Sequence, residues 1–182
     1  MRWMFVFLFF TFVSCENDLA TVQGSGKSKT QMDEVKDVES YFSQSGLLKA
    51  KLTAPLMLRY HDTMPRVEFP HTLHVDFFEA NENIQSYLDA QKGFYYESQG
   101  KVLLEDRVVV IRKDGDTLKT QKLYWEQGAH RFFTDADVEI RQKTKTIFGT
   151  GFESDEQLKN FRIDTVTGVM LVADEEVSNK SN

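Results

Sequence analysis

The chain of 182 residues is poor in the residues that stabilise or punctuate special folds: it has one cysteine, three prolines and ten glycines. One cysteine excludes a disulfide framework within the chain and any cysteine-based zinc cluster. So few prolines and glycines exclude collagen-like and proline-rich sequences. Lysine and arginine total 22 against 28 acidic residues, a net charge of −6, and form no basic block. Because neutralising phosphates needs clustered cations, we expect no nucleic-acid partner.

Recognisable catalytic motifs are also missing. The sequence has no serine nucleophile elbow, phosphate-binding loop or dinucleotide fingerprint. His71 and His74 are three apart, which on a strand puts their side chains on opposite faces, a poor arrangement for one metal ion. We therefore expect no metal, no cofactor and no enzyme, and favour binding or transport. A hydrolase with catalytic carboxylates scattered along the chain stays open as an alternative.

The longest apolar run lies near the start of the chain, where Arg2 precedes residues 3–13. These residues would make a helix of about 16 Å, whereas a membrane span needs about 20 residues. A short apolar run behind a basic residue is typical of a secretory signal. Because Ser14 and then Cys15 follow, the segment resembles a bacterial lipoprotein signal. We predict a signal peptide over residues 1–14 and lipidation of Cys15; an uncleaved N-terminal anchor is the alternative.

The remaining chain divides by its pattern. Residues 15–40 are predicted to be the lipidated N-terminus and a flexible tether, because the segment is polar and contains Gly24-Ser25-Gly26. Helical spacing of four apolar residues favours a short helix before the domain: Val35, Val38, Tyr41 and Phe42. The domain is expected over residues 41–173, and a polar tail over residues 174–182.

From Leu47 onward, apolar and polar residues alternate, as in Leu48-Lys49-Ala50-Lys51-Leu52. Turn signals such as Gln127-Gly128 separate these segments. Short strands between regular turns predict an all-β sandwich, barrel or jelly roll. A faint repeat of 30 residues, which maps Leu88 on Leu118 and Val110 on Ile140, indicates stacked β units.

Several short segments, in this order, carry a family resemblance: residues 45–55, 68–70, 86–90, 115–120, 123–125, 134–140 and 147–154. Together they resemble the LptC family, the periplasmic component of the lipopolysaccharide export machinery, in the short lipoprotein-like form found in Bacteroidetes. The resemblance implies an open two-sheet antiparallel β jelly roll, V-shaped and related to LptA. It implies that the acyl chains of lipopolysaccharide pass along the apolar interior of that fold.

The resemblance further implies the partners and the location. The chain would accept lipopolysaccharide from the periplasmic domains of an inner-membrane ABC transporter and pass it to an LptA-like bridge protein by edge-to-edge strand pairing. It would be periplasmic and anchored to the inner membrane through Cys15, where the enterobacterial form has a transmembrane helix. The alternatives are an envelope lipoprotein module that binds another apolar ligand or a protein, and the LptA-like bridge itself.

Twelve apolar residues on the predicted strands are candidates for lining a lipid groove: Leu88, Val102, Val108, Val110, Leu118, Trp125, Phe132, Val138, Ile140, Ile147, Phe161 and Ile163. The same residues would also fill the closed core of any β sandwich, so core packing stays open for each. The family's arrangement implies that strands near residues 48–58 face the transporter and strands near residues 161–172 face the bridge. The candidate edge contacts are Leu48, Ala50, Leu52, Met170 and Leu171.

Overall fold

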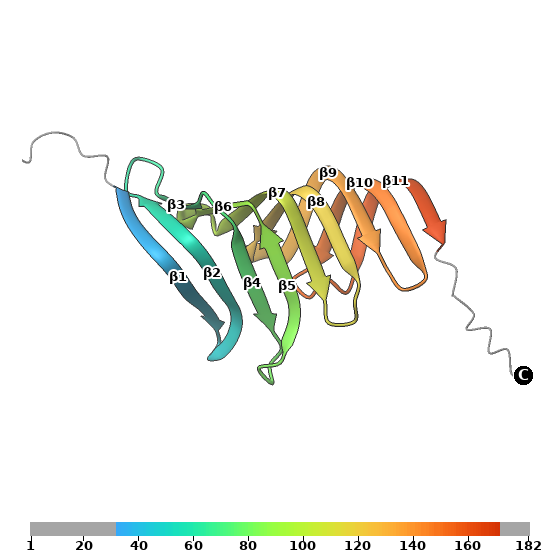
Figure 1. The fold of residues 1–182 in the computed structure, drawn as a ribbon, viewed down its shortest axis with the longest axis horizontal. Coiled ribbons are helices and arrows are strands. Elements are labelled where there is room, and N and C mark those ends of the chain that lie inside the picture. The colour runs from blue at the N-terminus through green and yellow to red at the C-terminus, as the bar shows by residue number, and fades with distance from the viewer. Residues whose placement is uncertain (1–31, 172–182) are drawn as a thin grey trace, which may run out of the picture.

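The computed structural model describes residues 32–171, which form eleven antiparallel strands in one continuous sheet. The strands are β1 (Met32–Gln44), β2 (Leu47–Tyr60), β3 (Arg66–Phe69), β4 (Leu73–Phe78), β5 (Ile84–Ala90), β6 (Lys92–Tyr96), β7 (Lys101–Arg112), β8 (Thr117–Glu126), β9 (Arg131–Arg141), β10 (Lys145–Asp155) and β11 (Phe161–Leu171). Figure 1 shows β1 at one end of the long axis and β11 at the other. The predicted all-β antiparallel fold is confirmed.

Two short 3-10 turns, η1 (Glu97–Gln99) and η2 (Gln127–Ala129), are the helical elements among the described residues. Neither has the length or the hydropathy that crossing a membrane requires of a helix. The predicted signal peptide, Cys15 and the polar tail lie outside the described residues.

The long strands bend and take part in two layers. Residues 101–105 of β7 pair with β6, whereas its residues 109–112 pair with β5. At the bend between them, Asp106 and Arg107 adopt positive φ angles of 62° and 53°. β2 splits in the same way, pairing with β4 through residues 50–53 and with β3 through residues 58–60. We call the layer that contains β4 and β5 layer A, and the layer that contains β3 and β6 layer B.

The strands after β7 continue both layers, and their registers shift where they bend. In β8 this shift lies between Thr120 and Tyr124. In β10 the shift spans Gly151, whose φ is +75°. A Cβ atom on Gly151 would lie 2.5 Å from Oδ2 of Asp164 on β11. Only glycine therefore combines this backbone conformation with so close an approach of the neighbouring strand.

The N-terminal part of the sheet differs from the sequence prediction. Residues 35–42 belong to strand β1, so the expected short helix is wrong. β1 pairs with β2 from Met32 to Gln44, and this pairing satisfies backbone groups that a helix would otherwise satisfy internally. The sheet thus begins before residue 41, where the domain was expected to start. Asp37, with a φ of 51°, and Pro55 are skipped in the register, since proline has no N–H to donate.

The repeat of 30 residues has a structural counterpart. Residues that the repeat relates, such as Leu88 and Leu118, belong to one row of residues that crosses neighbouring strands. In this row each residue pairs with the next: Leu88, Val110, Leu118, Ile140, Ile147 and Val169. A second row runs through Val67, Tyr95, Val102, Trp125 and Phe132. Directly paired residues share one face of a sheet. Each row is therefore a continuous apolar stripe across the inner face of its layer.

Candidate functional site

An apolar cavity of about 250 Å³, called the wide cavity below, lies between the two layers in the N-terminal half of the sheet. Its walls come from both layers: Leu52, Val75 and Leu88 from layer A, and Val67, Tyr95 and Val102 from layer B. Arg59 and Glu97 lie at its border and form an ion pair of 2.6 Å. An apolar interior with a few polar groups at its border fits a ligand that is mostly hydrocarbon.

A second cavity, of about 290 Å³, adjoins the first at the mouth between the layers. Both cavities share five lining residues: Phe42, Ala50, Phe77, Trp125 and Phe132. The other residues of the second cavity are mostly polar and come from the ends of strands and from turns: Gln44, Lys49, Phe78, Glu79, Ala80, Gln85, Glu156, Gln157 and Lys159. The interior is therefore amphipathic, with an apolar floor and a polar mouth.

Four aromatic side chains form the floor where the two cavities meet. The rings of Trp125 and Phe132 stack with centroids 5.8 Å apart. Phe77 lies edge-on to both, at 6.1 and 5.9 Å, and Phe42 is edge-on to Trp125 at 5.8 Å. Each such pair contributes about 0.5–1.5 kcal/mol beyond the area it buries. Because Phe42 and Phe77 come from layer A and the other two from layer B, the cluster holds the two layers together.

The indole of Trp125 is fixed by the loop between β10 and β11. Its Nε1 donates a hydrogen bond of 2.9 Å to Oε1 of Glu156. The other oxygen of Glu156 lies 3.0 Å from Nδ1 of His130. The polar end of a buried tryptophan usually finds such a partner. The loop that holds Glu156 is thereby coupled to the floor of the interior.

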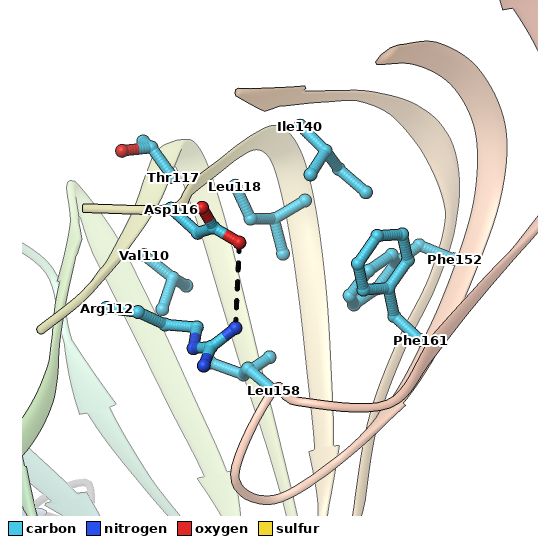
Figure 2. A pocket seen from close by; sticks show the side chains of 9 residues that line it. All are labelled: Val110, Arg112, Asp116, Thr117, Leu118, Ile140, Phe152, Leu158 and Phe161. Atoms are coloured by element: carbon cyan, nitrogen blue, oxygen red, sulfur yellow. Dashed lines mark ion pairs between the residues drawn. The ribbon is translucent and has the colours of Figure 1, made fainter. Parts of the chain in front are cut away.

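The C-terminal half of the interior is nearly filled. Between Val110, Leu118 and Ile140 of layer A and Phe152 and Phe161 of layer B, a space of only about 20 Å³ remains. The side chain of Leu158, from the β10–β11 loop, occupies this region (Figure 2). Arg112 and Asp116 form an ion pair of 3.7 Å at its border. A space of this size holds about one water molecule, so the interior is open in its N-terminal half and closed in its C-terminal half.

All twelve predicted groove residues lie in the apolar interior, either in its buried core or packed against it. They fall into three groups. Leu88, Val102, Trp125 and Phe132 line the wide cavity; Val110, Leu118, Ile140 and Phe161 line the small one; Val108, Val138, Ile147 and Ile163 line neither of these. Further wall residues on β2, β3 and β4 were not predicted as groove residues: Leu52, Val67, Phe69, Val75 and Phe77. Their strict alternation with polar residues was the signal that could have found them.

The edges of the sheet correct one prediction. Leu48, Ala50 and Leu52 do not lie on a free edge, because β2 pairs with β1 along one side and with β4 along the other. Within residues 32–171, β1 and β11 are the strands that pair on one side only. The expectation that these residues lie at an edge came from the family's arrangement, in which strands near residues 48–58 face the transporter. Met170 and Leu171 do lie on edge strand β11, where they are 61% and 78% exposed.

The outer face of layer A carries the histidine that the sequence analysis considered for a metal. Nδ1 of His74 lies 2.7 Å from Asp89, and Nε2 lies 3.1 Å from Asp76. Burial alone would lower the pKa of His74, but the two carboxylates outweigh it and raise the pKa above its usual value. No group of three possible metal ligands comes together among residues 32–171.

A family comparison bears on the function. A sequence profile described as "Lipopolysaccharide-assembly, LptC-related" matches residues 6–170. The chain belongs to the LptC-related family. Members of this family are non-catalytic transport components that act in lipopolysaccharide assembly in the cell envelope. A comparison with curated proteins gave no match.

Proposed function

We propose that this chain is a carrier that shelters the acyl chains of lipopolysaccharide between layers A and B. The observation that carries the proposal is the wide interior, with apolar walls from both layers and a polar mouth. Each methylene that leaves water gains about 0.8 kcal/mol. Such a groove removes the barrier to moving a lipid through water without any chemistry, whereas the polar headgroup stays at the mouth.

The two edge strands are the proposed docking sites. The periplasmic domains of the inner-membrane ABC transporter pair with β1, and an LptA-like bridge pairs with β11. Open edge strands offer unpaired N–H and C=O groups to a partner strand, and long apolar ones invite association. On β11, Val166 and Val169 are 55% and 57% exposed although they pair with the inner-face residues Gly149 and Ile147. A partner strand added there would cover them and extend the apolar stripe.

The proposed location is the periplasm, with Cys15 lipidated and held in the inner membrane after removal of residues 1–14. The sequence around Cys15 supports this, and the described part of the sheet begins at Met32, 17 residues after Cys15. Two or more acyl chains give stable anchoring where one is marginal. Mass spectrometry of the N-terminal peptide tests it: an unmodified thiol at Cys15 would leave an uncleaved N-terminal segment as the anchor.

The carrier function is tested by mass spectrometry of the full-length protein purified from its own envelope. We expect lipid A-type species to be bound. Protein that is free of lipid, from cells that make lipopolysaccharide, would overturn the proposal. It would favour an envelope module that binds another apolar ligand or a protein.

A further inference from the structure

The loop between β10 and β11, residues 156–160, differs from the two turns that precede it at the margin of layer B. The turns before β7 and β9 are built on η1 and η2, bury no residue and end on a left-handed residue, Gly100 or His130. The β10–β11 loop has five residues where those turns have four. Its left-handed residue is Leu158, with a φ of 55°, and the side chain of Leu158 is only 6% exposed.

Leu158 fills the place that a ligand would take in the C-terminal half of the interior. Its side chain lies among apolar residues of both layers, including Leu118 and Phe161 (Figure 2). The walls there continue the stripes of the wide cavity, yet only about 20 Å³ is left, against about 250 Å³ in the wide cavity. A leucine in the left-handed region is strained and persists only where its surroundings hold it. Here the buried side chain holds it.

Polar contacts fasten the loop across the mouth. On layer B, Asp155 accepts hydrogen bonds from the backbone N–H groups of Lys159 and Asn160, at 3.0 and 3.3 Å. On layer A, Nε2 of Gln85 donates to the carbonyl oxygen of Gln157 at 3.2 Å. The strands themselves do not depend on the contact with layer A. The loop can therefore leave layer A without any loss of strand pairing.

We propose that Leu158 occupies an acyl-chain site in the C-terminal half of the interior, and that the β10–β11 loop must lift before a saturated acyl chain enters that site. This inference rests on the proposed carrier function. An acyl chain that moves from the wide cavity toward β11 meets Leu158 before it reaches the exposed edge. The loop thus separates a receiving compartment from a delivering one.

The test places a photoreactive residue in each compartment of the full-length protein. Tyr95→benzoylphenylalanine reports on the wide cavity, and Phe161→benzoylphenylalanine reports on the C-terminal site, with lipid A as the probe. In each background, Gln85→Cys and Gln157→Cys are joined by a short bismaleimide, because the contact of a long side chain with a backbone oxygen is too wide for a disulfide. Variants that carry only one of the two added cysteines, treated with the same reagent, control for reaction at Cys15.

We expect the cross-link between positions 85 and 157, called the tie, to reduce lipid labelling at position 161 at least about fivefold. Labelling at position 95 should stay unchanged. Leu158→Ala should raise labelling at position 161 severalfold, whereas the matched change Leu103→Ala, on the outer face of β7 between the cavity residues Val102 and Leu104, should not. Equal labelling at position 161 with and without the tie, or no response to Leu158→Ala, would overturn the inference. An absence of labelling at position 95 in every variant would overturn the carrier function instead. Thermal unfolding checks that each variant is folded.

Discussion

A charge on the wall of the wide cavity should separate lipid binding from folding. Val102 is the best position, because it lines the cavity and is only half-buried, so its replacement leaves the strand paired. In the lipid-free protein the carboxylate of Val102→Asp can keep water in a cavity of about 250 Å³. We expect the variant to lose no more than about 1–2 kcal/mol of folding free energy, a fraction of the 1.5–3 kcal/mol for full burial of a valine.

Lipid binding should suffer far more. An acyl chain in the cavity removes the water from the carboxylate, and an uncompensated buried polar group costs at least about 2 kcal/mol. Since 1.4 kcal/mol is a factor of ten, the affinity for lipid A should fall about 30-fold or more. Val102→Asn, which has nearly the same shape without the charge, should lose less. Native mass spectrometry of the full-length protein titrated with lipid A measures the bound fraction, and urea unfolding measures the stability.

The matched control is Val109→Asp on the same strand. Val109 pairs with Lys119 and Asp89, which places it on the outer face of layer A. Its replacement should leave lipid affinity unchanged. If Val102→Asp is folded and binds lipid A as well as the unmodified chain does, the cavity is not the lipid site. Phe132 is a less informative position, because it is fully buried in the aromatic cluster and a charge there would unfold the protein.

Three further predictions concern stability and docking. His74→Gln should lower the free energy of unfolding by less than about 1 kcal/mol at pH 5.5 and should not lower it at pH 8.5. The raised pKa of His74 in the folded state gives stability that is present below the unfolded pKa of 6.5 and is lost as pH rises through the folded pKa. Equal losses at both pH values in urea titrations would contradict this prediction. Gly151→Ala should lower the free energy of unfolding, measured in urea, by about 1–3 kcal/mol. Gly115→Ala should lower it less, because Gly115 has a φ of +94° but open space around it. Equal losses of stability would show that the contact of position 151 with β11 is unimportant. Replacing both Met170 and Leu171 with lysine should weaken binding to the bridge protein in pull-downs and spare the transporter, and loss of neither would refute the assignment of the β11 edge.

The sequence predicts the inner strands well because each has one buried and one solvated face. The alternation of apolar and polar residues in 73–77 and 137–141 predicts which side chains point inward. The structure confirms strands in both segments. The same rule fails for β1, where Val38 is the one buried residue. An edge strand that exposes most of its residues carries no clear alternation, so its apolar residues were misinterpreted as helical. Tertiary pairing with β2 decides the structure there.

The sequence could not separate groove from core. Val102 and Val108 both sit at inward positions of β7, yet Val102 lines the wide cavity and Val108 is buried without lining it. What distinguishes them is the bend at Asp106 and Arg107, which turns the two halves of the strand into different layers. Nothing in the pattern locates that bend. The burial of Leu158 could not be predicted either, because a single apolar residue in a polar turn is usually exposed and nothing in the sequence indicates its left-handed φ of 55° or its burial.

The stripes across the sheet join the carrier function to the edge strands. A stripe such as Leu118–Ile140–Ile147 crosses from strand to strand, so it runs along the long axis of the molecule rather than along any one strand. It ends at Val169, which is exposed because β11 pairs on one side only within residues 32–171, although its partner Ile147 packs on the core. A partner strand in register at β11 would supply the next member of the stripe. The same backbone pairing that docks a partner would therefore also extend the apolar path, and Leu158 lies on that path beside Leu118 and Phe161.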